Sequence, residues 1–247
     1  MPQSPSVQIP PFHWWRTVFF LIPAISVYTL VLGTLSVGAS LFDKRGGFAH
    51  GCARAWAWLI LATTRVDVRV RGLDRLRRDV TYVFVSNHQS IYDIPILFAS
   101  LPFQLRIVAK ESLGRFPVLG WHLRWAGHVL VNRSHPGAGI KRRLSGLLEH
   151  GLSLIVFPEG TRSIDGTVQA FRRGIFVLAI EAGLPMVPLS VVGSRHVMRK
   201  GRLMTCPGEV ELVIHEPIST ASLTIDDARR LADQIREVVR SSMDAPT

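Results

Sequence analysis

The chain has 247 residues, enough to bury one substantial core but too few for a sizeable second domain. Its hydrophobic content of 47% favours membrane association, and its formal charge of +11 favours an anionic partner: nucleic acid, a membrane surface or a phosphorylated substrate. The two cysteines, Cys52 and Cys206, lie far apart outside any C-x-x-C pattern, which argues against a disulfide scaffold and a structural zinc site.

A long apolar run follows a proline-rich lead-in of 16 residues. Residues 17–42 contain no charge over 26 positions. As a helix the run would measure about 39 Å, which exceeds the roughly 30 Å hydrocarbon core of a bilayer. It is too long for the apolar region of a signal peptide, and only Arg16 precedes it. Because it contains Pro23 and Gly33, the sequence leaves open whether it spans the bilayer or folds back into one leaflet.

The second apolar stretch, residues 51–64, is shorter and carries one arginine and two tryptophans. That length and composition predict an interfacial or packing helix rather than a second span. Basic residues at 44, 45 and 54 follow the long run, whereas only Arg16 precedes it. The positive-inside rule therefore predicts that the rest of the chain faces the cytoplasm.

From Arg65 onward, predicted strands alternate with predicted helices. The strands are Val66–Gly72, Thr81–Val85, Arg106–Ala109, His128–Asn132, Leu152–Phe157, Met186–Val192 and Glu209–His215. The helical stretches are Asp93–Ser100, Phe116–Gly127, Gly139–Gly151, Arg172–Gly183 and Asp226–Met243. This order predicts an α/β fold with a largely parallel sheet flanked by helices. We divide the chain into membrane-anchoring helices in residues 1–64 and an α/β domain in residues 65–247.

In open α/β sheets, ligands bind beyond the carboxyl ends of the strands, and the first such exit reads SNHQSIYD (Ser86–Asp93). Histidine is the usual general base at neutral pH, and a carboxylate on its far nitrogen fixes the tautomer. The chain contains no G-x-S-x-G, so a His88–Asp93 pair would suit deprotonation of a substrate hydroxyl. The pair requires His88 in the loop and Asp93 in the first helical turn, because five positions along one helix are about 140° apart. The alternative makes Asp93 a helix N-cap and His88 an ordinary loop residue.

Two further exits carry cations. Lys110 and Arg133 follow neighbouring predicted strands, where they either converge on a phosphate or remain solvated surface charges.

The exit FPEGTRS (Phe157–Ser163) forms a turn around Glu159. In that turn Arg162 is suited to bidentate phosphate binding, and Glu159 to accepting from a hydroxyl or orienting the arginine. The alternative is an ordinary surface Glu–Arg pair.

Four stretches in this order closely resemble the four sequence blocks of the glycerolipid acyltransferases, and more narrowly of the 1-acylglycerol-3-phosphate (lysophosphatidate) acyltransferase family. They are NHQSIYD, AKESLGRFPVLGW with the VNR that follows it, FPEGTRS and MVPLSVVG. The matching region runs from about Arg65 to Glu216. The N-terminal apolar segments also resemble the membrane-embedding helices of that family.

The resemblance implies transfer of a fatty acyl group from acyl-CoA or acyl-carrier protein to the sn-2 hydroxyl of lysophosphatidate, giving phosphatidate. It implies no cofactor, no metal and no nucleic acid. The expected partners are the thioester donor, a lysophospholipid acceptor and the lipid bilayer. The expected location of the catalytic domain is the cytoplasmic face of the inner membrane.

The resemblance also implies roles for individual residues. His88 would be the general base and Asp93 its orienting partner. The residues implied for binding the acceptor phosphate are Glu159, Gly160, Thr161, Arg162, Lys110 and Arg133. Pro188, in the fourth block, would lie on the acyl-donor side.

One departure concerns the acceptor: Glu111 stands where many family members carry a second basic residue. This leaves another lysolipid, such as a lyso-amino-acid lipid, as an alternative acceptor. Two other functional classes are a membrane-tethered protein that binds anionic lipid without catalysis, and a hydrolase in which His88 activates water.

Overall fold

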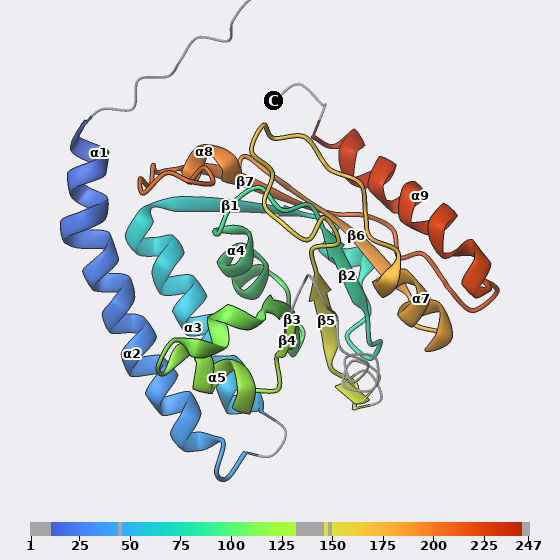
Figure 1. Ribbon diagram of the computed structural model, residues 1–247, viewed down its shortest axis with the longest axis horizontal. Helices are drawn as coiled ribbons and strands as arrows, with labels where there is room; N and C mark the ends of the chain where they lie inside the picture. Colours follow the sequence, from blue (N-terminus) through green and yellow to red (C-terminus); the bar gives the residue numbers. More distant parts are fainter. Residues whose placement is uncertain (1–10, 44–45, 132–145, 148–149, 244–247) are drawn as a thin grey trace, which may run out of the picture.

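The computed structural model describes residues 11–43, 46–131, 146–147 and 150–243. Within them a seven-stranded sheet has the order β1-β7-β6-β2-β5-β3-β4 (Figure 1). The strands are β1 (Val66–Arg71), β2 (Val83–Ser86), β3 (Leu105–Lys110), β4 (Val129–Val131), β5 (Ser153–Val156), β6 (Met186–Val192) and β7 (Gly208–Ile214). The strands from β6 to β4 in this order are parallel, whereas β7 runs antiparallel to β6 and parallel to β1. The predicted largely parallel sheet is confirmed.

Helices cover both faces of the sheet. They are α1 (Pro11–Arg16), α2 (Ile22–Ala39), α3 (Gly47–Thr64), α4 (Asp93–Ser100), α5 (Leu119–Trp125), α7 (Gly174–Glu181), α8 (Ser194–Val197) and α9 (Ala228–Ser241). Short 3-10 turns lie at Leu73–Arg75, Glu111–Arg115 and Ile225–Asp227. Helices α3 and α4 pack with one face of the sheet, and α7 and α9 with the other (Figure 1).

The central strand β2 shows why the loop that follows it is held firmly. Val83, Phe84 and Val85 are fully buried. Phe84 packs in the α3/α4 layer, whereas Val83 and Val85 pack in the α7/α9 layer, as the alternation of side chains along a strand requires. A strand buried on both faces reads as a continuous apolar run, as TYVFV does. The loop after Ser86 is therefore attached to a strand that packing holds in place on both faces.

Each predicted strand of the α/β portion is found within its predicted range, allowing for one or two residues at the ends. The helix predicted at Gly139–Gly151 lies mostly outside the described residues.

The long apolar run does not break at Pro23 or Gly33. The helix continues from α1 through a π-helical turn, Thr17–Leu21, into α2. Because proline has no N–H and its ring crowds the preceding turn, a widened π turn just before Pro23 lets the helix continue. The chain reverses only after Ala39.

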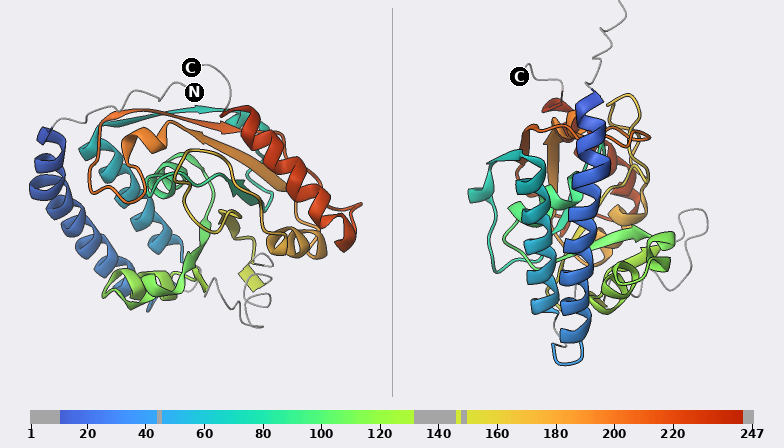
Figure 2. Two further views of the ribbon diagram at one scale, coloured as in Figure 1. Left: turned by 45° about the horizontal axis from the view of Figure 1, so that its top comes forward. Right: turned by 90° about the vertical axis from the view of Figure 1, so that its left-hand side faces the viewer.

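Helix α3 returns alongside α2, so the two form an antiparallel hairpin (Figure 2). The Tyr28 and Thr63 hydroxyls lie 3.0 Å apart, and Trp56 Nε1 donates to Thr29 Oγ1 at 3.0 Å. Arg16 donates to the Thr64 carbonyl at 3.1 Å. The end of α3 therefore lies beside the start of the apolar run.

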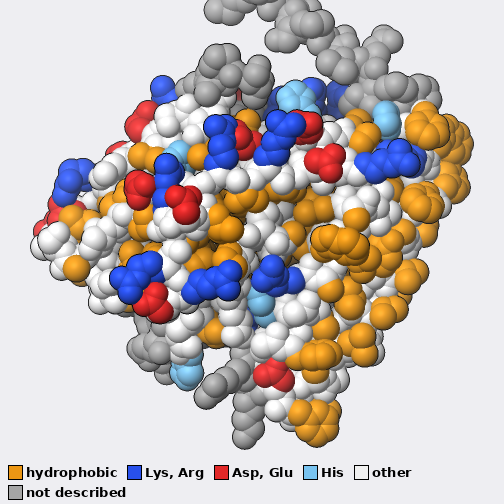
Figure 3. Space-filling model, turned by 180° about the vertical axis from the view of Figure 1, so that it is seen from behind, with side chains coloured by type: hydrophobic (Ala, Val, Ile, Leu, Met, Phe, Trp, Pro, Cys, Tyr) orange, Lys and Arg blue, Asp and Glu red, His pale blue; other side chains and the backbone are white. Residues whose placement is uncertain are grey.

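One side of this hairpin is apolar and uncovered. The helix Phe12–Ala39 is long and apolar enough to cross a bilayer, and only 6% of its most apolar window is buried. Its most exposed large apolar residues include Phe12, Phe19, Phe20, Val27, Leu30 and Val31. Figure 3 shows apolar side chains gathered along this edge, with the cations spread over the remainder of that face. Helix α3, in contrast, packs into the core through Ala57, Ile60 and Leu61, as the sequence predicted for a packing helix.

Candidate active site

Three neighbouring strand exits meet at one edge of the sheet. Strand β2 lies between β5 and β6 and is parallel to both, so their carboxyl ends face the same way. The loop after β2 carries His88, the turn after β5 carries Glu159, and α8 follows β6. This is where ligand sites of parallel sheets form.

His88 and Asp93 are in contact. His88 Nδ1 lies 2.8 Å from Asp93 Oδ2, with His88 in the loop and Asp93 at the first position of α4. The Asp93 carboxylate is fully buried and turns back toward the loop, where Oδ2 also accepts from the N–H groups of Gln89 at 2.8 Å and Ser90 at 2.9 Å. The N-cap position of α4 belongs to Tyr92. Asp93 therefore does not cap α4 through its side chain.

This contact determines which nitrogen of His88 accepts a proton. A carboxylate only accepts hydrogen bonds, so the neutral imidazole donates from Nδ1 and keeps its lone pair on Nε2. Nε2 has no hydrogen-bond partner among the described residues. The ring stacks on Phe157 with centroids 4.1 Å apart, and 9% of the side chain is exposed. The arrangement is that of an oriented base with one open nitrogen.

Glu159 holds this loop from the β5 side. Its side chain is buried, Oε1 accepts from the His88 N–H at 2.7 Å, and Oε2 accepts from the Gln169 N–H at 3.2 Å. The Ser163 N–H in turn donates to the His88 carbonyl at 2.7 Å. No salt bridge joins Glu159 to Arg162 in the described part of the chain. Glu159 fixes the backbone of His88, and its direct contact with an acceptor stays a prediction.

Burial makes the Glu159 carboxyl sensitive to pH. Burial raises its pKa from 4.5 to about 7, against the two N–H bonds that favour the carboxylate. Because an acid with a raised folded pKa is more stable when protonated, its contribution to stability is fully present below about pH 4.5 and is lost as pH rises to about 7. At about 1.36 kcal/mol per pKa unit, this shift corresponds to a change of about 3 kcal/mol in the free energy of unfolding between the two ends of that pH range.

Glu159→Gln should remove this dependence. We expect the melting temperature of the wild type to fall relative to that of the variant between pH 4.5 and 7, because glutamine does not ionise. Thermal melts across that range test this, with Glu209→Gln, an exposed partner of Arg69, as the control. An identical pH slope in wild type and Glu159→Gln would contradict the role assigned to burial.

The turn after Glu159 brings cations together. Gly160 has φ +75°, a backbone conformation that favours glycine, and the end of the Arg172 side chain lies against it. Lys200 Nζ donates to Thr161 Oγ1 and to the Arg162 carbonyl, both at 2.9 Å. The Arg162 guanidinium has no hydrogen bond or ion pair with another described residue. The turn thus presents cationic groups next to the His88 loop.

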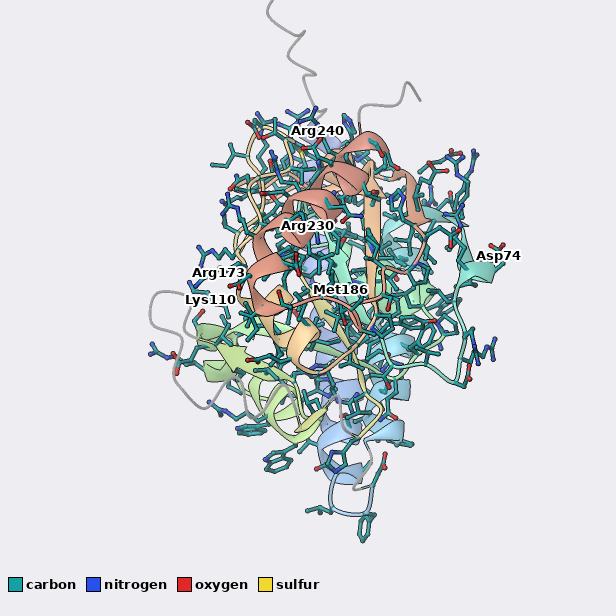
Figure 4. All side chains as sticks on the ribbon, turned by 90° about the vertical axis from the view of Figure 1, so that its right-hand side faces the viewer. Asp74, Lys110, Arg173, Met186, Arg230 and Arg240 are labelled. Atoms are coloured by element: carbon teal, nitrogen blue, oxygen red, sulfur yellow. The ribbon has the colours of Figure 1, made fainter. Side chains whose placement is uncertain are left out.

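The remaining predicted residues lie elsewhere. Lys110 ends β3 and is exposed (Figure 4), two strands from β2 along the same edge. Arg133 lies outside the described residues. Pro188 is buried within β6 opposite Val85, before the strand ends, so it does not line the exit itself.

An apolar cavity of about 200 Å³ opens beside the site. It lies among α2, α3, α4 and α5, and its lining includes Leu32, Ala53, Trp56, Ile94, Phe98 and Leu123. Ile91, from the loop between His88 and Asp93, also lines it. The loop that carries His88 therefore also lines the cavity.

Two residues of this region were not singled out by the sequence. Ser194 contacts the Asp93 carboxylate and Lys200 contacts the turn of Thr161. Each lies far along the chain from its partner, and only the position of Ser194 directly after the fourth block hinted at either.

Comparison with known proteins gives consistent matches. The family model described as acyltransferase matches residues 67–192. The chain is 34% identical over 221 residues to a chloroplastic 1-acyl-sn-glycerol-3-phosphate acyltransferase of Brassica napus, covering 85% of this chain and 63% of that protein. It is 34% identical over 237 residues to a 1-acyl-sn-glycerol-3-phosphate acyltransferase of Chlamydomonas reinhardtii, covering 94% of this chain and 68% of that protein. The chain thus spans less than two thirds of the Brassica protein's length.

A solved structure matches over almost the whole chain. The crystal structure of the 1-acyl-sn-glycerophosphate acyltransferase PlsC from Thermotoga maritima superposes with a TM-score of 0.79 at 28% identity, covering 92% of each chain.

Proposed function

This chain belongs to the acyltransferase family, and we propose that it transfers a fatty acyl group from a thioester donor to the sn-2 hydroxyl of lysophosphatidate, giving phosphatidate. The observation that carries the proposal is the His88–Asp93 pair, with Nε2 open, beside a cationic turn. The matched relatives are named for acylating 1-acyl-sn-glycerol-3-phosphate, which supports this acceptor. The donor is acyl-CoA or acyl-carrier protein.

The chemistry needs a base and a positioned hydroxyl. A thioester is already activated, so no covalent acyl-enzyme is required. His88 Nε2 takes the hydroxyl proton as the oxygen attacks the thioester carbonyl, and Asp93 stabilises the imidazolium. The tetrahedral intermediate then expels the thiolate, which takes the proton back from His88. General-base catalysis contributes about 10²–10⁴-fold, so positioning must supply much of the remainder.

The two ends of the acceptor find matching surroundings. Its phosphate fits the cations of the turn, Arg162 and Lys200, with Lys110 and Arg133 as the family's second-block ligands. The apolar cavity that Ile91 connects to the base is suited to an acyl chain.

Arg162→Ala should mainly weaken binding of the acceptor. We expect KM for lysophosphatidate to rise about 10-fold or more with kcat little changed, because a charge-assisted hydrogen bond to phosphate is lost from the ground and transition states alike. Steady-state kinetics with varied acceptor concentration test this. Arg230→Ala is the control, because Arg230 lies on α9 and is already paired with Asp227. A KM unchanged by Arg162→Ala would remove this residue from the phosphate site.

We also propose that residues 1–64 anchor the protein in the membrane, with residues 65–247 forming the catalytic portion. The uncovered apolar side of the Phe12–Ala39 helix would face lipid, and the hairpin would enter and leave on one face. The positive-inside rule orients a single span, and it does not orient this hairpin, because residues 44 and 45 lie between α2 and α3 rather than beside the catalytic portion. The cytoplasmic face of the inner membrane is therefore proposed from the family resemblance alone.

Charges on this side should release the protein from lipid. The double variant Leu30→Lys, Val31→Lys places two ammonium groups on exposed positions of α2, which is costly within hydrocarbon. We expect a large fall in co-sedimentation with liposomes. Ile225→Lys, similarly exposed before α9, is the matched control and should sediment like the wild type. Undiminished sedimentation of the double variant would place the anchor elsewhere.

A panel of acceptors tests the assignment of the headgroup. Purified enzyme with a long-chain acyl-CoA, or with acyl-carrier protein as donor, is given lysophosphatidate, other lysophospholipids or a lyso-amino-acid lipid. We expect the highest kcat/KM with lysophosphatidate. A higher value for another lysolipid would retain the chemistry and overturn the headgroup, which is the alternative that Glu111 keeps open.

A further inference from the structure

The Asp93 carboxylate has a partner on each oxygen. Oδ2 receives the bonds from His88, Gln89 and Ser90, whereas Oδ1 receives a single bond, from Ser194 Oγ at 2.5 Å. Both Asp93 and Ser194 are fully buried. In the described part of the chain Ser194 is therefore the only partner of Oδ1.

The fold aims Ser194 at this oxygen. Ser194 begins α8 directly after β6, which pairs with β2. Gly193 makes the sharp turn between them: it has φ +91°, and a Cβ there would lie 2.9 Å from the Glu209 carbonyl oxygen. A second bond, from Ser90 Oγ to the Met198 carbonyl at 2.8 Å, ties the same loop to the residue after α8. The position of Ser194 is thus fixed by the backbone on both sides.

A buried carboxylate needs this donor. Each unpaired oxygen in a dry site costs free energy, and hydrogen bonds to an ionised group are stronger than those between neutral groups. A donor on Oδ1 also fixes the rotation of the carboxylate, which decides how Oδ2 faces the imidazole.

We propose that Ser194 is a positioning residue of the acyl transfer: its hydroxyl holds the Asp93 carboxylate in the rotation at which Oδ2 meets His88 Nδ1. The inference rests on the proposed function, because it assigns Ser194 a part in the work of the His88–Asp93 pair. Ser194 touches neither acceptor nor donor in this scheme.

Ser194→Ala should lower kcat by about 10- to 100-fold, the equivalent of one charge-assisted hydrogen bond, and leave KM for the acceptor unchanged. Ser194→Thr keeps the hydroxyl and should restore most of kcat. Ser190→Ala is the matched control, because it removes a buried hydroxyl from the neighbouring strand β6. That hydroxyl contacts His215 and the Val239 carbonyl instead of Asp93. It should leave kcat unchanged.

A spectroscopic readout keeps the test independent of turnover and of the fit of threonine. The His88 Nδ1 proton gives a low-field NMR resonance when it is bonded to a carboxylate, assigned by its loss in His88→Gln. It should move upfield in Ser194→Ala and stay in place in Ser190→Ala. A wild-type kcat and an unmoved resonance in Ser194→Ala would overturn the positioning role, as would a loss of kcat with the resonance unmoved. If the wild type transfers no acyl group but the resonance moves, the proposed function fails and the contact that Ser194 makes to Asp93 stands.

Discussion

His88→Ala is expected to lower kcat for acyl transfer by about 10²–10⁴-fold, because it removes the imidazole that we propose takes the hydroxyl proton. The fold should survive: His88 lies in a loop, and its backbone bonds to Glu159 and Ser163 do not depend on the ring. Rates of thiol release in the presence of lysophosphatidate, together with circular dichroism and melting temperature, measure both effects.

His196→Ala provides the control for this substitution, because His196 is an exposed histidine of α8. It should retain wild-type turnover. Near-normal kcat in His88→Ala would end the general-base assignment, whatever the behaviour of other variants.

Asp93→Asn is expected to cause a loss of kcat of similar size, about 10²–10⁴-fold, with only modest destabilisation. The amide oxygen can take the place of Oδ2 and accept from the N–H groups of Gln89 and Ser90, while its NH₂ group faces Ser194 Oγ, which can accept. The negative charge that stabilises the imidazolium is lost, so the effect should appear in kcat.

Asp93→Ala separates the two roles of the carboxylate. It leaves the buried N–H groups of Gln89 and Ser90 without partners, and we expect it to cost about 3 kcal/mol more in the free energy of unfolding than Asp93→Asn. Denaturant unfolding measures the difference, with Asp79→Asn, an exposed partner of Arg77, as the control. Wild-type kcat in Asp93→Asn would show that the charge plays no part in catalysis.

The elements that the sequence predicted are those specified by local patterns. The apolar run of β2 marked a strand buried on both faces, and the polar residues after it marked the exit loop. The condition on the pair, His88 in the loop and Asp93 in the first turn of α4, could be stated from helix geometry alone. The structure meets that condition with a 2.8 Å contact.

What the sequence could not predict depends on partners far apart in the chain. Glu159 bonds the His88 N–H from 71 positions away, and Ser194 bonds Asp93 from 101 positions away. Neither contact has a periodic or spacing signature, because each follows from β5 and β6 lying on either side of β2. The apolar cavity likewise forms only where four helices meet.

The fate of the N-terminal run is a tertiary effect as well. Pro23 and Gly33 are helix-weakening residues by local rules, yet the helix continues through both. Packing against α3 compensates, through contacts such as Trp56 Nε1 to Thr29 Oγ1. Pro23 therefore follows a π-helical turn and does not end the helix, and the chain reverses only after Ala39.

The most direct test of the central claim compares thiol release from acyl-CoA, and from acyl-carrier protein if acyl-CoA gives none, under three conditions: without acceptor, with lysophosphatidate, and with its analogue lacking the sn-2 hydroxyl. If His88 deprotonates that hydroxyl for attack on the thioester, release will require lysophosphatidate, phosphatidate will form in equal amount, and the deoxy analogue will give none. Equal release under all three conditions would make water the nucleophile and the protein a thioester hydrolase. Binding of lipid without any release would contradict catalysis itself.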